Sequence, residues 1–263
     1  MTRRERQKRQ AAKSTGFATV LFEKRDGIAW VTLNRPKVLN AYNVQMRDDL
    51  HQVLSAIHDD PEVRAMVLTG AGKAFSTGGD VTEFGQAPSP IVARWVRFRR
   101  DVWGLLRSLP IPTIAAVHGA TVGGGLEMAL LCDIAIAADN TKIRLPETGL
   151  GMIPGVAGTQ TVARQAGLGH GLDLCLTGRW IDAGEAQHIG LVAEVVPLRA
   201  LRRRAHALAR EFTRLPRITV AVAKLAVSSG LDMPLRDALE LERRLARRLK
   251  SWVERQDRDA VLK

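Results

Sequence analysis

Apolar and polar residues follow two spacings along this chain, one typical of strands and one typical of helices. Segments 19–25 and 28–33 are strand-like and flank an Asp-Gly pair, which predicts a hairpin with a tight turn. Apolar residues then recur every three or four positions over 44–57, which predicts a helix with Asn43 as its N-terminal cap. The chain therefore opens with a hairpin and a helix.

Strands and helices are predicted to alternate through the rest of the chain. Trp95 and Leu105 are expected to face inward from one long amphipathic helix. The predicted strands are 65–69, 113–117, 134–138, 143–145 and 192–196, and the predicted helices are 91–109, a helix ending at 132, 158–167, 170–177, 183–190 and the chain from 198 onward. This order predicts an α/β domain with parallel strands, followed by an α-helical region.

Composition divides the chain into three expected parts. Residues 1–16 are polar and Arg-rich without apolar periodicity, which predicts a basic disordered tail rather than a signal peptide. Residues 17–197 form the predicted catalytic core, and 198–263 form the predicted helical C-terminal region. The two cysteines are too few for a disulfide framework, and no apolar run is long enough to span a membrane. We expect a cytoplasmic protein with no membrane partner.

The net charge of +12 first suggests a polyanionic partner such as nucleic acid. Its distribution argues otherwise: residues 1–13 carry +5, residues 199–263 carry +9, and residues 14–198 carry −2. Aromatic residues make up 5% of the chain and do not interleave with a basic strand, which counts against stacking on single-stranded nucleic acid. A nucleic-acid-binding module that uses the basic ends remains an alternative, and salt-dependent binding would reveal it.

Two glycine-rich loops and two glutamates are the candidates for chemistry. Gly123-Gly124-Gly125 lies between an apolar strand and a helix that contains Glu127, where backbone N–H groups can approach a ligand closely. Gly78-Gly79-Asp80 follows another strand, at the edge where α/β sheets bind ligands. Glu147 follows a proline at a third strand end. Each feature alone is also compatible with a structural turn or a solvated surface acid.

Several familiar sites are excluded by spacing. The glycines do not form the G-x-G-x-x-G pattern of a dinucleotide-binding turn, and 70–79 lacks the G-K-[ST] ending of a P-loop. The six histidines and two cysteines do not have the spacing of a zinc site, so no metal is predicted. His118 is expected to shape a loop rather than to react.

Taken in order, the motifs resemble the crotonase superfamily, the enoyl-CoA hydratase/isomerase family, over about residues 18–230. The matching fragments are Ile28–Leu33 with Asn34-Arg35-Pro36-Lys37, Ala74–Asp80, Ala115–Gly119, Gly123–Glu127, Cys132–Ile134, Leu145–Glu147, Gly151–Gly155 and Gly158–Gln160. The resemblance implies an α/β spiral of ββα units and a C-terminal helical region that forms a homotrimer or a dimer of trimers.

The resemblance also implies the chemistry. Members of this family bind an acyl-CoA thioester, and two backbone N–H groups, matching Gly79 and Gly124 here, stabilise the enolate oxygen. The hydratases of the family have two glutamates at the positions of Glu127 and Glu147. By this pattern Glu127 is expected to take a proton from water, and Glu147 to deliver one to Cα.

The expected function is therefore hydration of a trans-2-enoyl-CoA, and the alternative is another crotonase reaction, such as isomerisation of the double bond or dehydration of a specialised hydroxyacyl-CoA. No cofactor is expected, because coenzyme A belongs to the substrate. Arg35 and Lys73 are further candidates for its phosphates. The residues implied to contact the substrate are Lys37, Ala74, Gly78, Gly79, Asp80, Val81, Gly123 and Gly124.

Overall fold

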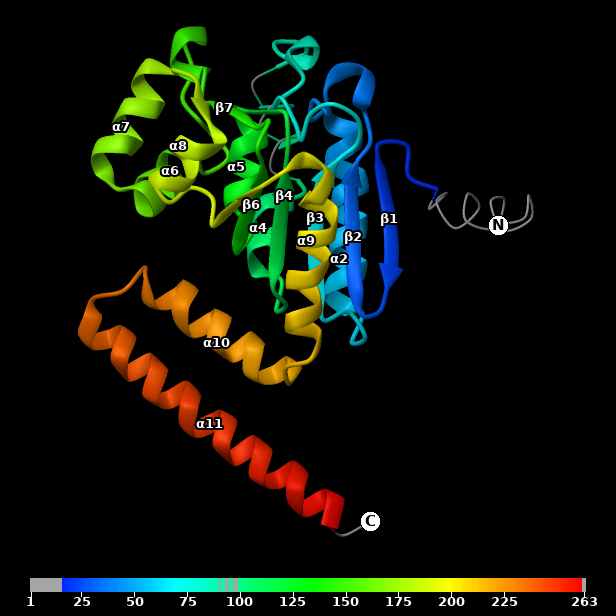
Figure 1. Ribbon diagram of the computed structural model, residues 1–263, viewed down its shortest axis with the longest axis vertical. Coiled ribbons are helices and arrows are strands. Elements are labelled where there is room, and N and C mark those ends of the chain that lie inside the picture. Colours follow the sequence, from blue (N-terminus) through cyan, green and yellow to red (C-terminus); the bar gives the residue numbers. More distant parts are fainter. Residues whose placement is uncertain (1–15, 90, 93–94, 97–98, 262–263) are drawn as a thin grey trace.

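The computed structural model describes residues 16–89, 91–92, 95–96 and 99–261 (Figure 1). Within them the chain forms a mixed α/β fold with a larger and a smaller sheet. The larger sheet has the strand order β1-β2-β3-β4-β6-β9, and the smaller has the order β5-β7-β8. The strands are β1 (Val20–Arg25), β2 (Ile28–Leu33), β3 (Ala65–Gly70), β4 (Thr113–Val117), β5 (Ala120–Val122), β6 (Ile134–Ala138), β7 (Lys142–Arg144), β8 (Ile181–Asp182) and β9 (Glu194–Val196).

Helices cover the larger sheet and then extend beyond it. The helical elements are η1 (Pro36–Val38), α2 (Val44–Asp59), η2 (Val81–Glu83), α4 (Val102–Ser108), α5 (Gly124–Leu130), η3 (Glu147–Leu150), α6 (Gly158–Ala166), α7 (Leu168–Thr177), α8 (Ala183–His188), α9 (Leu198–Thr213), α10 (Arg217–Gly230) and α11 (Leu235–Val261), where η marks a 3-10 helix.

The predicted hairpin is confirmed. β1 pairs antiparallel with β2, and the turn residues Asp26 and Gly27 have φ angles of 53° and 74°. Such left-handed residues give a two-residue turn the twist that its flanking strands require. The remaining pairs of the larger sheet, β2 with β3, β3 with β4, β4 with β6 and β6 with β9, are all parallel.

Alternate residues of the central strands build two cores. Ala29, Val31 and Met66 are buried on the face that α2 and α4 cover, whereas Trp30 and Val67 are buried on the opposite face, under α9. Figure 1 shows α2 and α9 on the two sides of the sheet. Because α9 packs directly on the sheet, the first helix of the predicted C-terminal region takes part in the core.

The helix predicted over 91–109 is wrong in its extent. Residues 99 and 100 form a bend, and α4 begins only at Val102, where the Asp101 side chain accepts a hydrogen bond from the backbone of Gly104 at 2.8 Å. An N-terminal cap of this kind starts a new helix instead of continuing an old one. Trp95, predicted to face inward, is 55% exposed.

Other sequence predictions hold with small shifts. Asn43 caps α2 by accepting from the Met46 backbone N–H at 2.9 Å, as predicted. The strand predicted at 143–145 is β7, one residue earlier, and β5 was not predicted at all. Apart from Gly16, the predicted basic tail at 1–16 lies outside the described residues.

The last two helices form an arm that extends from the sheet domain. α11 packs along α10, and Figure 1 shows the pair running away from the two sheets. The Lys224 ammonium of α10 attaches the arm to the core through the Ile111 carbonyl at 3.0 Å and the Asp133 carboxylate at 2.8 Å. None of the helices in the described residues is long and apolar enough to cross a membrane.

Candidate active site

The loop that follows β3 is fixed against β5 on one side. The Ser76 backbone N–H donates to the Ala120 carbonyl at 3.3 Å, and its carbonyl accepts from the Val122 N–H at 3.0 Å. These bonds continue the pairing of the smaller sheet by one more residue. They bring the Gly78-Gly79 segment beside the start of α5, which follows β5 directly.

The same loop is fixed on its other side by Tyr42. The Tyr42 N–H donates to the Gly78 carbonyl at 2.7 Å, and the Asp80 N–H donates to the Tyr42 carbonyl at 2.8 Å. Gly79 lies between these two bonds and contributes neither group to them. Successive peptide groups of an extended segment point in opposite directions, so the Gly79 N–H points away from Tyr42.

The Gly79 and Gly124 N–H groups lie close together. A Cβ built on Gly124 would lie 3.6 Å from the Gly79 nitrogen, and one built on Gly78 would lie 2.8 Å from the Gly124 nitrogen. Among the described residues, neither N–H donates to a protein acceptor. Gly124 also opens α5, where the helix dipole adds positive potential. The pair has the geometry to bind an oxygen that gains negative charge.

Glycine is required where these segments touch. Gly78 and Gly123 have φ angles of 84° and 51°, which side chains rarely tolerate. A Cβ on Gly125 would overlap the Ser76 carbonyl oxygen, so α5 and the loop approach each other backbone to backbone.

Glu127 lies one turn into α5 and is only 1% exposed. Its Oε1 accepts hydrogen bonds from the backbone N–H groups of Val156 at 2.8 Å and Gly158 at 2.7 Å. Two donors on one oxygen orient the carboxylate and stabilise negative charge on it. The chain after η3 therefore holds the Glu127 side chain in place.

Glu147 begins η3 and reaches the same glycines from the other side. A Cβ on Gly123 would lie 2.5 Å from its Oε1, whereas a Cβ on Gly124 would lie 3.8 Å from Oε2 of Glu127. The two carboxylates therefore lie beside adjacent residues, Glu147 beside Gly123 and Glu127 beside Gly124. The Glu147 Oε2 atom is buried and has no hydrogen-bond partner among the residues that the structure describes. Burial raises the pKa of Glu147, and the charge of Glu127 raises this pKa further.

The structure thus brings together all four residues predicted to be catalytic: Gly79, Gly124, Glu127 and Glu147. Two carboxylates with different surroundings lie beside two N–H donors. One carboxylate accepts two backbone N–H bonds, and the other has a pKa raised by burial. Such a set can move two protons while a carbonyl oxygen gains charge.

The predicted substrate contacts lie in three segments, which are η1, the loop of residues 74–81, and the start of α5 at Gly123 and Gly124. Lys37 is exposed on η1 and Val81 is exposed at the start of η2, while Ala74 is buried below the loop. The Asp80 carboxylate is paired with Arg35 at 2.8 Å. These positions stay predictions of substrate contact, and the described residues hold no group of three or more His, Cys, Asp or Glu side chains suited to a metal.

Asn40 is a residue that the sequence reasoning missed. It is fully buried with a φ of 58°, and its amide nitrogen lies 2.9 Å from the Ala71 carbonyl, 2.8 Å from the Ala74 carbonyl and 3.1 Å from the Phe75 carbonyl. It therefore fixes the first half of the loop that carries Gly79. The sequence around Asn40 did not predict this role, because an asparagine four residues after Pro36, in a predicted loop, is usually expected to be exposed.

Cys175 of α7 was missed as a neighbour of the site. Burial raises the pKa of this thiol, and the charges of Glu147 and Glu127 raise it further. The thiol is therefore near both carboxylates, on the side where α7 packs on η3. No motif in the sequence joins it to them.

His118 shapes the loop, as predicted. Its carbonyl accepts from the Phe75 N–H at 2.8 Å, and its Nε2 lies 3.3 Å from the Gly72 carbonyl. Burial lowers the pKa of the imidazole. We infer no proton transfer through this side chain, because both contacts are to backbone.

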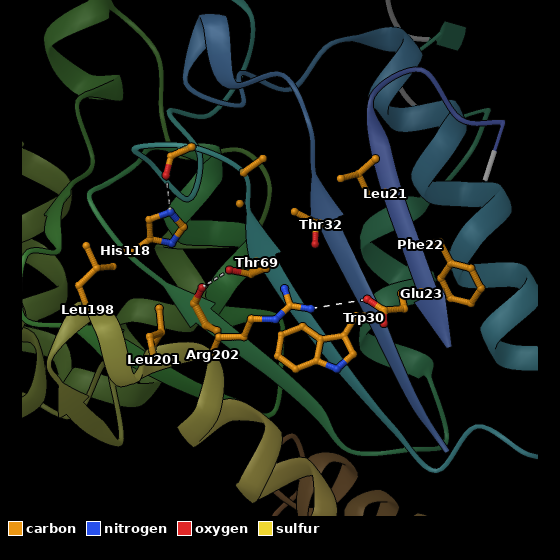
Figure 2. Close-up of a pocket in the computed structure, with 14 residues that line it drawn as sticks. Leu21, Phe22, Glu23, Trp30, Thr32, Thr69, His118, Leu198, Leu201 and Arg202 are labelled. Atoms are coloured by element: carbon orange, nitrogen blue, oxygen red, sulfur yellow. Dashed lines mark hydrogen bonds and ion pairs between the residues drawn. The ribbon is translucent and has the colours of Figure 1, made fainter. Parts of the chain in front are cut away.

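A cavity of about 390 Å³ lies elsewhere, at the ends of β2, β3 and β4 beside α9 (Figure 2). Its lining includes Trp30, Thr32, His118 and Arg202, and neither Glu127 nor Glu147. Arg202 lies over the Trp30 ring at 4.3 Å and 3.6 Å from the Glu23 carboxylate, so its charge is already engaged. This cavity is separate from the carboxylate pair.

Comparisons with known proteins show which family this chain belongs to. The family profile described as "Enoyl-CoA hydratase/isomerase" matches residues 23–259. The chain is 38% identical over 224 residues to the short-chain-enoyl-CoA hydratase of Clostridium acetobutylicum, covering 85% of this chain and 86% of that one. It is 36% identical over 240 residues to the mitochondrial enoyl-CoA hydratase of Pongo abelii, covering 90% and 82%.

Solved structures show the same fold. The crystal structure of an enoyl-CoA hydratase from Bacillus anthracis superimposes with a TM-score of 0.83 at 32% identity, covering 92% of this chain and 97% of that one. The match includes the C-terminal helices, and the proteins of this family are enzymes. The chain belongs to the enoyl-CoA hydratase/isomerase family, the crotonase family.

Proposed function

We propose that this enzyme adds water to a trans-2-enoyl-CoA and releases a 3-hydroxyacyl-CoA. The observation that carries the proposal is the placement of Glu127 and Glu147 beside adjacent glycines, next to the free N–H groups of Gly79 and Gly124. A family member that needed only enolate stabilisation could dispense with one of the two acids. The two hydratases compared above support the same reading by similarity.

The thioester carbonyl oxygen lies between the Gly79 and Gly124 N–H groups in this mechanism. A water molecule between the carboxylates attacks Cβ, and Glu127 takes its proton as the C–O bond forms. The π electrons of the enoyl group move onto the thioester oxygen, where the two N–H groups stabilise the enolate. Glu147 then gives its proton to Cα, so that both elements of water are added on the same side, a syn addition.

The environments of the glutamates support this division of roles. Glu127 accepts two backbone N–H bonds, as suits a base that starts as an anion. Glu147 is half-buried beside that carboxylate, and both this burial and the charge of Glu127 raise its pKa, which favours the protonated form that an acid needs. The reverse reaction exchanges the two roles.

The coenzyme A part of the substrate would lie along η1 and the glycine loop. Lys37 and Lys73 are exposed there and can pair with phosphate groups. We propose no further cofactor, since coenzyme A belongs to the substrate. The proposed site takes no metal.

We also propose that the arm of α10 and α11 joins copies of this chain into a trimer or a dimer of trimers. Large apolar side chains are exposed along both helices, which is unusual for a helix pair facing water. They are Leu225, Val227, Leu231, Leu235, Leu239, Trp252 and Val253.

The proposal is tested by the enzyme's choice of substrate. We expect fast loss of the conjugated enoyl-thioester absorbance when crotonyl-CoA is supplied, with 3-hydroxybutyryl-CoA as the product. A 3-enoyl-CoA supplied in parallel separates hydration from isomerisation. Turnover of the 3-enoyl-CoA to the 2-enoyl-CoA without hydration of crotonyl-CoA would show an isomerase instead.

A further inference from the structure

The guanidinium group of Arg35 bonds to two other residues of this chain. Its Nη1 lies 2.6 Å from the Ala41 carbonyl and 2.8 Å from Oδ2 of Asp80. Ala41 precedes Tyr42, and Asp80 follows Gly79. One guanidinium nitrogen therefore joins the two segments that the Tyr42–Gly79 bridge brings together.

This connection bears on the direction of the Gly79 N–H. The bridge consists of two hydrogen bonds, one to the carbonyl before Gly79 and one from the N–H after it. The N–H of Gly79 itself keeps its direction only while both neighbouring peptide groups are held. The Arg35 guanidinium holds Asp80 through the Asp80 carboxylate. The same guanidinium holds the Tyr42 segment through the backbone carbonyl of Ala41.

The pair is largely shielded from water, and both oxygens of the Asp80 carboxylate are bonded. The side chains of Arg35 and Asp80 are 22% and 10% exposed. The other oxygen of Asp80, Oδ1, lies 2.6 Å from the Thr82 hydroxyl and 3.2 Å from the Thr82 nitrogen. The Thr82 hydroxyl and then Arg35 lower the pKa of Asp80, so the carboxylate stays ionised at neutral pH. Charge-assisted bonds of this kind are short and directional.

A second anchor fixes Arg35 itself. Its backbone N–H donates to the Asn40 side-chain oxygen at 2.9 Å, and the Asn40 amide holds the loop carbonyls on the other side. Arg35, Asn40 and Asp80 thus form one network around the bridge. The exposed cations Lys37 and Lys73 remain for contact with phosphate.

We propose that Arg35 and Asp80 are a positioning pair that holds the Gly79 N–H in the direction needed to stabilise the enolate oxygen, an inference that rests on the proposed function. The pair acts on the rate of the chemical step. It does not contribute to binding of the coenzyme A moiety. Either partner alone is insufficient, because each holds one side of the bridge.

Kinetics and a chromophoric substrate analogue test this role. Arg35→Gln, Asp80→Asn, the double variant and the conservative Arg35→Lys are compared with wild type in crotonyl-CoA hydration. A cinnamoyl-CoA with a para-dialkylamino group reports on the N–H pair, because its absorption moves to the red when its thioester carbonyl is polarised. Arg204→Gln is the control, since it removes an arginine–carboxylate pair of 2.7 Å with Glu194, between α9 and β9.

We expect Arg35→Gln and Asp80→Asn to lower kcat by about 10- to 100-fold with KM within about threefold of wild type. The red shift of the bound analogue should shrink in both, the double variant should be no worse than the worse single variant, and Arg35→Lys should recover part of the rate. Arg204→Gln should match wild type. Circular dichroism identifies any variant that does not fold, and Arg35→Lys, which keeps the charge, then carries the comparison.

Two results would overturn the inference while the wild type is active. One is a raised KM in Arg35→Gln with kcat and the red shift unchanged, which would make Arg35 a phosphate contact. The other is unchanged kcat in Asp80→Asn. A wild type that neither hydrates crotonyl-CoA nor shifts the analogue would instead overturn the proposed function, and this inference with it.

Discussion

At the scale of single residues, Glu147 is a carboxyl group whose surroundings oppose its negative charge. Its Oε2 is buried and has no hydrogen-bond partner within the described part of the chain, and the negative charge of Glu127 raises the pKa of Glu147. A surface glutamate would meet neither condition. Placing this side chain beside Glu127 and the glycine-rich loop lowers the stability of the fold. This loss is expected for an acid that must hold its proton near neutral pH.

The raised pKa predicts how activity depends on pH. Because Glu147 acts as the acid, kcat/KM for crotonyl-CoA should fall as pH rises through its raised pKa. This fall in kcat/KM is measured by steady-state rates across pH in wild type and in Cys175→Ala. The Cys175→Ala variant removes a neutral neighbour of Glu147 and should show the same fall. A rate that stays flat to alkaline pH would argue against Glu147 as the proton donor.

The same pKa predicts a gain in stability when the acid is removed. An acid with a pKa raised by folding destabilises the native state at pH values where it would ionise when unfolded. Glu147→Gln should therefore have a higher Tm than wild type at pH 8, and the difference should fade as pH falls below the usual range of a glutamate. Equal Tm values at pH 8 would contradict the burial of an unpaired carboxylate.

The residues of the site show what sequence could and could not predict. Glu127, Glu147, Gly79 and Gly124 are predicted because each lies in a short motif at the end of a strand, and because the order of these motifs resembles the crotonase family. Asn40 and Cys175 were missed because they act across loops and helices that only the fold brings together. The Arg35–Asp80 pair was missed for the same reason, since its partners are 45 positions apart in the sequence.

At the scale of elements, the contact between α5 and the loop before it depends on two neighbouring glycines with different surroundings. A Cβ on Gly124 would meet its neighbours at ordinary distances of 3.5 Å or more, whereas one on Gly125 would overlap the Ser76 carbonyl. Gly124→Ala should fold with stability close to wild type. Gly125→Ala should lower the Tm and displace the Gly79 loop, although both variants gain the same helix propensity. Equal Tm values would contradict this close contact.

Asn40 makes a similar prediction for the loop after β3. Asn40→Ala leaves buried carbonyls at Ala71, Ala74 and Phe75 without their donor, at about 1–3 kcal/mol for each group left unsatisfied. Urea unfolding should show a loss of at least about 2 kcal/mol. The exposed Asn140 serves as the control, and Asn140→Ala should change little. A small loss in both variants would mean that water satisfies these carbonyls.

Element prediction succeeded where the local signal and the tertiary contacts agree. The Asp26-Gly27 turn and the Asn43 cap are of this kind. The helix predicted over 91–109 failed because Asp101 offers a competing cap that an apolar pattern does not reveal. β5 was missed because it is short and pairs with segments far along the chain, at β7 and at Ser76.

At the scale of the whole molecule, the loop after β3, α5 and η3 carry the site, and the arm of α10 and α11 extends away from the two sheets (Figure 1). Residues 199–263, which include α9 on the sheet as well as the arm, carry a net charge of +9, while residues 14–198 carry −2. The carboxylate pair is thus set in a near-neutral body. The arm presents both arginines and apolar side chains to its surroundings.

The exposed apolar side chains of the arm predict self-association. Light scattering should give the mass of three chains or six. Leu239→Glu with Trp252→Glu should shift this mass toward one chain, because each places a charge in an apolar contact. Arg243→Glu, which also changes the charge of α11, serves as the control. A wild-type mass of one chain would contradict the proposed assembly.

The most direct test of the central claim is the rate of crotonyl-CoA hydration by wild type, Glu127→Gln and Glu147→Gln, with folding confirmed by circular dichroism. Wild type should convert crotonyl-CoA to 3-hydroxybutyryl-CoA, and each variant should lose about 10²–10⁴-fold in kcat because each lacks one proton-transfer group. Full hydration activity in both folded variants would contradict the account.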